Sequence, residues 1–172
     1  MSETADFTIR DATDADLPAI QALTRRSYEE VAFVMQPSAW QGLASAIEAA
    51  LSSTDSKDRI VAVSNGQIIG SVLLYPPAAQ AYGELTGSNA VPELRLLAVA
   101  LPARRKGVAR ALVEECIRRA KLMGAKELGL HTSRSMRAAI RLYAKLGFVR
   151  APERDFQPPG AEVVEGYRLV LD

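Results

Sequence analysis

The middle of the chain changes from strand-like to helix-like periodicity and back again. ELRLLAV at 93–99 is apolar in its second half, and ELGLHT at 127–132 is another short apolar run, so both are predicted to be strands. Between them, 108–123 repeats apolar residues every three or four positions and is followed by Gly124, which predicts a helix with a glycine cap. Strand, helix and strand in this order form a βαβ unit, whose two strands should be parallel with a right-handed crossover.

The segments before this unit predict two helices and a hairpin. Thr13 is a candidate N-cap for a helix over 14–31, and a second helix is expected after Pro37-Ser38. Asn65-Gly66 between the runs RIVAV and QIIGSVLLY predicts a β-hairpin. Residues 76–92 are rich in Pro, Gly, Ala and Ser, which predicts a long surface loop.

The segments after the unit predict one more helix and a pair of strands. Apolar residues from Met136 to Leu146 recur at helical spacing until Gly147, and the runs FVR and GYRLVL read as strands separated by a Pro-rich loop. The order α-α-β-β-loop-β-α-β-α-β-β predicts an α/β (α+β) fold. Its sheet should be mixed and mostly antiparallel, with the parallel βαβ pair at its centre and helices flanking it.

Composition limits the class of protein. With 172 residues, 48% of them hydrophobic, we expect a single domain over residues 1–172. The single cysteine, Cys116, excludes an internal disulfide and lies on the apolar stripe of a predicted helix, which favours core packing. One cysteine and one histidine, His131, cannot form a Cys/His zinc site, and no metal is expected. The N-terminus lacks a signal-peptide pattern and no long apolar run occurs, so we expect a soluble cytoplasmic protein without a membrane partner.

Charge is distributed unevenly along the chain. The net charge is only +1, but residues 101–150 hold thirteen Lys/Arg against three Asp/Glu, and residues 1–50 hold three against eight. This asymmetry indicates an anionic partner for the third quarter of the chain, with solvated helix faces as the alternative explanation. The acidic first quarter, and the absence of aromatic residues interleaved with the basic ones, argue against a nucleic-acid partner.

A basic loop precedes the predicted helix at residue 108. Its sequence Arg104-Arg105-Lys106-Gly107-Val108-Ala109 leads into a helix N-terminus, where free amides and the helix dipole attract anions. Gly107 and Ala109 would let a phosphate approach those amides, and the cations would add charge-assisted hydrogen bonds. A P-loop would need GxxxxGK[ST] and a dinucleotide site GxGxxG, and the loop matches neither. A solvated basic turn is the alternative reading.

The same loop and its surroundings resemble the GNAT N-acetyltransferase superfamily. Arg104 to Ala109 is similar to the family signature Q/R-x-x-G-x-G/A, ELRLLAVALP to the strand before it, and AAIRLYAKLGFVR to the later tyrosine-bearing segment. The resemblance covers about 93–150 well, whereas the N-terminal segments agree only in the order of their elements. It implies a GNAT-like fold with acetyl-coenzyme A (acetyl-CoA) as cosubstrate.

The resemblance also implies which residues hold the coenzyme. Backbone groups of one strand would contact the acetyl carbonyl and the pantetheine arm, and the loop would bind the pyrophosphate. These residues are Leu97, Ala98, Val99, Arg104, Arg105, Lys106, Gly107, Val108, Ala109 and Arg110. Met136 joins them at a position where the family often carries Asn, and Arg134 or Ser135 could supply the polar contact that Met136 lacks.

Two further residues match catalytic positions of the family. Glu93 matches the position of a general base, and by strand alternation it should share a face with Arg95, Leu97 and Val99. A solvent-facing carboxylate, or one paired with Arg95, is the alternative. Tyr143 matches the tyrosine that assists the departing thiolate, with a core tyrosine as the alternative. His131 could line the acceptor cleft or be a structural histidine.

The expected function is transfer of an acetyl group from acetyl-CoA to a primary amine by direct attack. The alternative is a non-catalytic acyl-CoA-binding or regulatory module, which would need neither Glu93 nor Tyr143. The sequence does not identify the amine, and it leaves open a homodimer and a different acyl group. Tyr28, Trp40 and Tyr82 belong to segments that could form the wall of the acceptor site.

Overall fold

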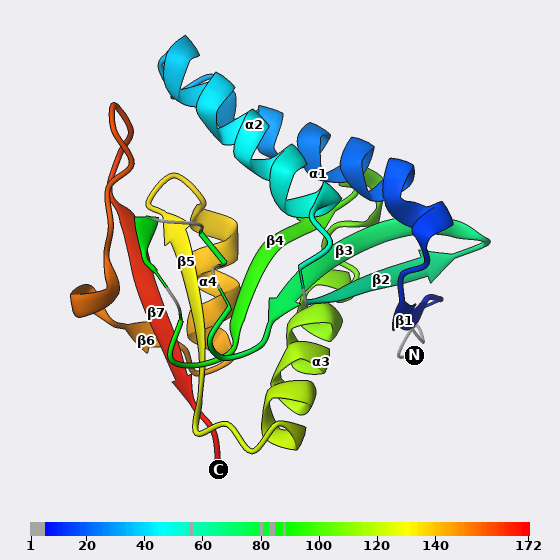
Figure 1. The fold of residues 1–172 in the computed structure, drawn as a ribbon. Helices are drawn as coiled ribbons and strands as arrows, with labels where there is room; N and C mark the ends of the chain where they lie inside the picture. The colour runs from blue at the N-terminus through cyan, green and yellow to red at the C-terminus, as the bar shows by residue number, and fades with distance from the viewer. Residues whose placement is uncertain (1–5, 56, 80, 83–84, 88) are drawn as a thin grey trace.

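The computed structural model describes residues 6–55, 57–79, 81–82, 85–87 and 89–172, and within them seven strands form one sheet (Figure 1). In chain order the strands are β1 (Thr8–Asp11), β2 (Asp58–Ser64), β3 (Gln67–Tyr75), β4 (Glu93–Val99), β5 (Glu127–Ser133), β6 (Val149–Arg150) and β7 (Val164–Val170). Their spatial order is β1-β2-β3-β4-β5-β7-β6. Neighbouring strands are antiparallel except for the central pair, β4 and β5, which is parallel as the βαβ unit predicted.

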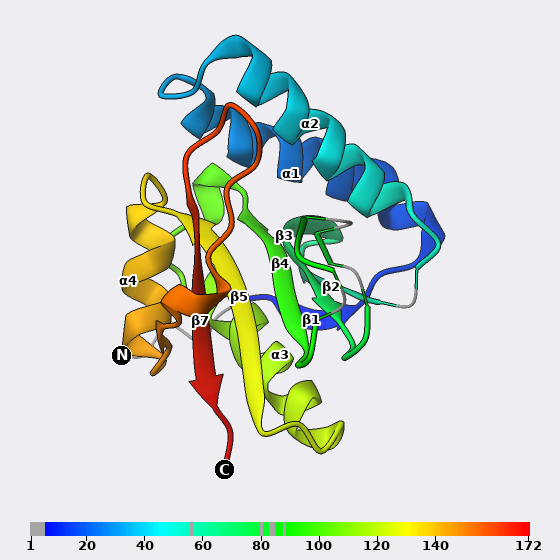
Figure 2. The ribbon, with the colours of Figure 1, turned by 60° about the vertical axis from the view of Figure 1, so that its left-hand side comes forward.

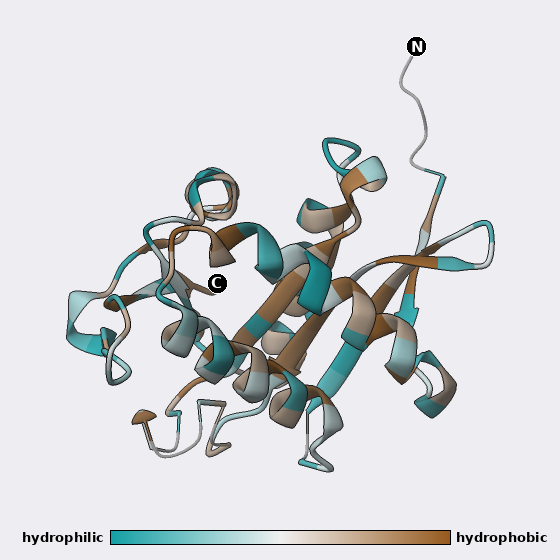
Figure 3. Cartoon of the chain, turned by 90° about the horizontal axis from the view of Figure 1, so that it is seen from above, coloured by the Kyte–Doolittle hydropathy of each residue, from teal (hydrophilic) through white to brown (hydrophobic). Residues whose placement is uncertain are grey.

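Helices cover both faces of the sheet. They are α1 (Leu17–Ala32), α2 (Pro37–Ser52), α3 (Val108–Leu122) and α4 (Arg137–Lys145). In Figures 1 and 2, α1 and α2 lie together over one face, and α3 lies on the opposite face. Figure 3 shows apolar residues concentrated on the strands between these layers. Within the part of the chain that the structure describes, no helix is long and apolar enough to cross a membrane.

Each face of the sheet has its own core. The core beneath α1 and α2 contains Ile20, Ile47, Ala50, Leu51, Val61, Leu73, Tyr75, Ala81 and Leu96. The core beneath α3 includes Ile60, Val72, Leu74, Leu94, Val99, Val108, Leu112, Cys116, Tyr143 and Phe148. A Cβ on Gly70 would lie 2.8 Å from Val108 Cγ1, so a glycine in β3 lets the first turn of α3 pack directly on the sheet.

Most predicted elements are confirmed. The first helix begins as a 3₁₀ turn at Asp14–Asp16, where the Thr13 N–H donates to the Asp16 carboxylate at 2.8 Å. The hairpin turns at Asn65 and Gly66 with φ of 51° and 74°, the left-handed pair that an Asn-Gly turn requires. One strand was missed: β1 has only four residues, too few to show an alternating pattern.

An irregularity in β4 changes which side chains share a face. Leu96 has a φ of 55°, and the register against β3 shifts because Leu73 faces Arg95 whereas Ser71 faces Ala98. One extra residue on β4 is a β-bulge, and it reverses the alternation beyond it. The prediction that Glu93 shares a face with Leu97 and Val99 is therefore wrong: both lie on the α3 side, whereas Glu93 lies on the α1 side.

The two parallel strands pair over only a short length. Glu93 faces Gly129 and Leu94 faces Leu130, and no further pairs follow between the described residues of β4 and β5. The strands separate toward their C-terminal ends, as Figure 2 shows. Part of the β4 edge is thus left without a strand partner, next to the loop that leads into α3.

Candidate active site

The loop between β4 and α3 presents free backbone amides. Arg105 and Gly107 have φ of 62° and 82°, so the chain makes two left-handed steps before the helix begins at Val108. The Ala111 N–H donates to the Gly107 carbonyl at 3.0 Å in the first helical hydrogen bond, which leaves the preceding amides of α3 without helical acceptors. Successive amides at a helix N-terminus with left-handed residues form an anion-binding concavity.

The cationic side chains of this loop differ in what they contact. Arg104 forms a bidentate ion pair with Glu30 of α1, with both N–O distances 2.8 Å, and its Nε donates to the Val99 carbonyl at 3.1 Å. Arg110 is paired with Glu114 on its own helix. Arg105 and Lys106 are exposed, and no ion pair joins them to any residue that the structure describes. These two side chains are thus the ones free to meet an incoming anion.

The β5-facing edge of β4 offers polar backbone groups. The Ala100 N–H donates to Ile69 of β3 at 2.9 Å. Because backbone groups alternate along a strand, those of Val99 point to the other side, where Arg104 reaches the Val99 carbonyl. Ala98 and Val99 are buried and Leu97 is half-buried. The Val99 amide therefore lies on the part of the β4 edge that has no strand partner, beside the loop.

Glu93 is a buried carboxylate with two hydrogen-bond donors. Only 3% of the residue is exposed. Its Oε1 accepts a hydrogen bond from the Tyr82 hydroxyl at 3.0 Å and lies 2.5 Å from His131 Nδ1, while His131 Nε2 lies 2.8 Å from the Arg154 carbonyl. Arg95 instead donates to the Ala81 carbonyl. The alternatives of a solvent-facing Glu93 or a Glu93–Arg95 pair are both wrong.

A cavity of about 350 Å³ opens onto this carboxylate. Three aromatic rings pack against one another in its wall, with centroids 4.8 Å apart for Tyr82 and His131 and 5.1 Å apart from each of these to Phe156. The cavity is lined by Tyr82, Leu85, Thr86, Asn89, Ala90, Val91, Glu93, His131, Glu153, Arg154, Asp155 and Phe156. The Asn89 amide holds the loop wall together by donating to the Pro76 and Val91 carbonyls, both at 2.9 Å.

Tyr143 lies in the core on α4. It is 5% exposed, and its ring lies 5.6 Å from that of Phe148. Burial raises the pKa of its hydroxyl well above the ordinary value, and the nearby Tyr28 raises the pKa further. The hydroxyl therefore keeps its proton at neutral pH, which suits a hydrogen-bond donor.

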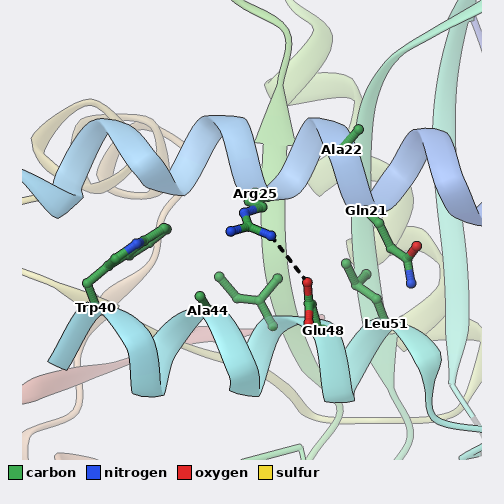
Figure 4. Close-up of a pocket in the computed structure, with 8 residues that line it drawn as sticks. Gln21, Ala22, Arg25, Trp40, Ala44, Glu48 and Leu51 are labelled. Atoms are coloured by element: carbon green, nitrogen blue, oxygen red, sulfur yellow. Dashed lines mark hydrogen bonds and ion pairs between the residues drawn. The ribbon is translucent and has the colours of Figure 1, made fainter. Parts of the chain in front are cut away.

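The remaining predicted residues lie outside this constellation. Met136 is the half-buried N-cap of α4 and Arg134 is paired with Glu165. Burial raises the pKa of Cys116 to about 12, in keeping with the core packing that we expected. Trp40 lines a separate cavity of about 200 Å³ between α1 and α2, where Arg25 approaches Glu48 at 3.5 Å (Figure 4). Among the described residues, no three His, Cys, Asp or Glu side chains are grouped as a metal ion would require.

Sequence reasoning missed the partners of Glu93. Tyr82 lies in a loop without periodicity, and the Arg154 carbonyl is a backbone group that no motif marks. The sequence allows His131 to line the acceptor cleft or to be a structural histidine, and the structure shows features of both roles. The side chain lines the cavity, and both of its ring nitrogens are hydrogen-bonded. The register of the parallel pair brings the two residues together: Glu93 faces Gly129 in the first half of β5, two residues before His131, and no local sequence pattern marks that register.

Comparison with known proteins identifies the family. The acetyltransferase (GNAT) family model matches residues 17–148. This chain belongs to that family. The rat N-acetyltransferase family 8 member 3 is 34% identical to this GNAT chain over 96 residues, which are 54% of the chain and 39% of the rat protein. The chain therefore matches less than half the length of that relative.

Solved structures share the fold over nearly the whole GNAT chain. The ribosomal-protein-alanine N-acetyltransferase of Brucella melitensis superposes with a TM-score of 0.66 at 24% identity, covering 95% of this chain and 99% of that one. The PaiA N-acetyltransferase of Thermoplasma acidophilum, solved in complex with coenzyme A, gives a TM-score of 0.68 at 17% identity over 95% and 98%. At these identities the likeness establishes the fold.

Proposed function

We propose that this protein transfers an acetyl group from acetyl-CoA to a primary amine by direct attack of the amine on the thioester. One observation carries the proposal: the edge of β4 that has no strand partner has free helix-terminal amides beside it, and a buried carboxylate lies where β4 and β5 pair. The free amides would bind an anionic coenzyme, and the carboxylate would take a proton from the amine substrate. Membership of the GNAT family supports the proposal.

The residues of the loop fit the phosphates of acetyl-CoA. Free amides at the start of α3 would donate hydrogen bonds to the pyrophosphate oxygens, and the exposed Arg105 and Lys106 would add positive charge. The Val99 amide at the edge of β4 would meet the pantetheine arm or the thioester carbonyl, where it would act as an oxyanion donor. The PaiA enzyme, which shares the fold, was solved in complex with coenzyme A, and this supports acetyl-CoA as the cosubstrate.

Glu93 would act as the base that takes a proton from the amine substrate. An alkyl ammonium with a pKa near 10.4 must lose a proton before it can attack, which costs about 4 to 5 kcal/mol at pH 7. Glu93 lines the cavity and would take that proton, directly or through a water molecule. The nitrogen lone pair then forms the C–N bond, the C–S bond breaks with its electron pair leaving on sulfur, and the nitrogen loses its second proton to solvent.

Tyr143 would stabilise the departing thiolate of coenzyme A. Its hydroxyl keeps its proton because burial raises its pKa. Complete transfer of that proton to a thiolate, whose conjugate thiol has a pKa near 8.5, would be uphill, so the hydroxyl would stabilise sulfur as a hydrogen-bond donor. The reaction then ends with a free thiol after the thiolate takes a proton from solvent.

The proposal is tested by thiol release from acetyl-CoA with a panel of amines. The panel should hold polyamines, aminoglycosides, free amino acids, and peptides with either a free N-terminal alanine or an internal lysine. We expect coenzyme binding by calorimetry and amine-dependent thiol release with at least one class. Binding without release from any class would favour the non-catalytic alternative, and absence of binding would overturn both.

A further inference from the structure

His131 faces a hydrogen-bond acceptor on each side of its ring. Nε2 lies 2.8 Å from the Arg154 carbonyl oxygen, which can only accept a hydrogen bond, so Nε2 carries a proton. Nδ1 lies 2.5 Å from Oε1 of Glu93. Two lone pairs would repel each other at that distance, so one proton lies between Nδ1 and Oε1.

This proton count fixes the charge of the pair. With the proton on Nδ1, an imidazolium faces a carboxylate, and with the proton on Oε1, a neutral imidazole faces a carboxylic acid. Both forms have zero net charge and hold one proton more than an ionised Glu93 beside a neutral His131. If this neutral pair took a further proton it would become a buried cation, which burial strongly disfavours.

We infer that the proton acceptor of the reaction is the Glu93–His131 pair acting as one unit, with His131 as a positioning residue held by the Arg154 carbonyl. This inference rests on the proposed acetyltransferase function. The pair must first release its shared proton to solvent and become a mono-anion. The lone pairs of Nδ1 and Oε1 then face each other, which disfavours this form, so the pair acts as a base only at a pH high enough to remove the shared proton. The substrate ammonium then gives one proton to the pair, which returns to zero charge, and the amine that remains attacks the thioester. As the C–S bond breaks and the thiolate leaves, the nitrogen loses its second proton to solvent.

The surroundings of the pair favour this cycle. From the loop before β4, the Tyr82 hydroxyl donates to Oε1, and burial raises its pKa so that it remains a donor. The Arg95 guanidinium of β4 lies over the Tyr82 ring, at 4.8 Å from its centroid. The segment after β6 contributes the other charged residues of the cavity wall, which are Glu153, Arg154 and Asp155. Asp155 is paired with Arg150, which lowers the pKa of Asp155 to about 2.

The two oxygens of Glu93 have different neighbours. Oε1 faces both donors, whereas Oε2 lies against the backbone of Gly129, where a Cβ would overlap it. The structure records no hydrogen bond to Oε2 from the residues it describes. Oε2 is therefore the oxygen left free to take the proton of an amine, while Oε1 still accepts from the Tyr82 hydroxyl.

The first test reads the proton directly. His131 is the only histidine of the chain, so ¹⁵N-histidine labelling of protein without a histidine tag gives signals from one ring. We expect Nε2 in the protonated range and Nδ1 shifted toward it near neutral pH. In Glu93→Gln, Nδ1 should move to the unprotonated range, whereas Glu48→Gln on the exposed side of α2 should leave both signals in place. An Nδ1 signal at the same position in the wild type and in Glu93→Gln would overturn the inference, because a shared proton must affect Nδ1 whether it lies on Nδ1 or on Oε1.

The second test reads the reaction. In His131→Asn the amide nitrogen can replace Nδ1 as a donor to Glu93 but carries no titrating proton, and in His131→Gln the amide can reach toward the Arg154 carbonyl instead. We expect the acid limb of the kcat/KM profile to move to lower pH in His131→Asn, because Glu93 then has no shared proton to release before it can act as a base. In His131→Gln we expect kcat/KM to fall at least about tenfold because Glu93 is no longer held.

The outcomes separate this inference from the proposed function. If wild-type protein releases no thiol with any amine, the proposed function and the role of the pair in it both fail. If the wild type is active and the acid limb of His131→Asn stays in place, only the inference fails. A purely structural histidine would lower the thermal midpoint of both variants without moving the limb.

Discussion

The position of the Glu93 carboxylate depends on the absence of a side chain at Gly129. Gly129 faces Glu93 across the parallel pair, and a Cβ built on Gly129 would overlap Oε2. Gly129 does not have a left-handed backbone conformation, so its φ angle does not require a glycine. What requires a glycine here is the lack of room for a Cβ atom. The position of the proposed base thus depends both on Glu93 of β4 and on Gly129 of β5.

Gly129→Ala should therefore damage activity more than stability. The added methyl group would displace the Glu93 carboxylate, and we expect kcat/KM to fall at least about tenfold, since small misplacements of a catalytic group are costly. Gly42→Ala is the matched control, because Gly42 lies in α2 with nothing within 4 Å of its Cβ position. This control should gain about 1 kcal/mol of stability and keep its activity. Unchanged kcat/KM in Gly129→Ala would contradict the base role of Glu93.

Tyr143→Phe separates a hydroxyl that assists the reaction from one that only packs. The ring packs beside Phe148 in both forms, so we expect the thermal midpoint to change little. Loss of the donor should lower kcat by about 10- to 100-fold, while calorimetry should find the affinity for coenzyme A nearly unchanged. A variant with wild-type turnover would remove Tyr143 from the mechanism.

At the scale of elements, the ion pair between Arg104 and Glu30 ties α1 to the loop before α3. It joins residues 74 positions apart, and the same guanidinium donates to Val99 at the end of β4. An incoming pyrophosphate would compete with the Glu30 carboxylate for Arg104. The helix that covers the Glu93 side of the sheet is thus linked to the proposed coenzyme loop.

Glu30→Gln should strengthen coenzyme binding. It releases Arg104 from an exposed ion pair worth about 0.2 to 1 kcal/mol, so we expect the Kd for coenzyme A to fall by about two- to fivefold in calorimetry. Glu29→Gln breaks only the Arg25 pair within α1 and should leave the Kd unchanged. A Kd that rises in Glu30→Gln would mean that the pair holds the loop in its binding conformation.

The sequence predicts elements well where the local pattern determines them. The βαβ unit, the Asn-Gly hairpin and the helix beginning at Val108 all have signals within a few residues. The bulge at Leu96 and the separation of β4 from β5 depend on how strands meet, so the expected alternation along β4 failed there. The Glu93–His131 contact joins residues 38 positions apart, and only the tertiary fold brings them together.

Across the whole molecule, the uneven charge distribution is partly neutralised within the chain. Arg104 meets Glu30, and Arg119 of α3 meets Asp11 of β1 and Asp58 of β2 at 2.7 and 3.0 Å. Acidic residues near the N-terminus thus pair with basic residues from the third quarter. An external anion explains only part of the asymmetry, chiefly at Arg105 and Lys106.

This network should make stability depend on pH through Glu115. Arg118 and Arg119 donate to its carboxylate at 2.6 and 2.9 Å, and they lower the pKa of Glu115 from an ordinary 4.5 to about 2. A carboxyl whose pKa is lower in the folded state stabilises the fold above the unfolded pKa, and that contribution is lost as pH falls through the folded pKa. The loss from Glu115 therefore lies between about pH 4.5 and pH 2.

Glu115→Gln removes this contribution. We expect its thermal midpoint to lie about 2 to 4 °C below that of the wild type at pH 7, for a loss of about 1 kcal/mol. At pH 3 the gap should shrink by more than half, because folding of the wild type then gains less from the ionised Glu115. Glu114→Gln, which loses only an exposed pair with Arg110, should stay within about 1 °C of the wild type at both pH values. A Glu115→Gln gap that is the same at pH 7 and pH 3 would show that the lost stability comes from packing of the side chain, since packing does not depend on ionisation.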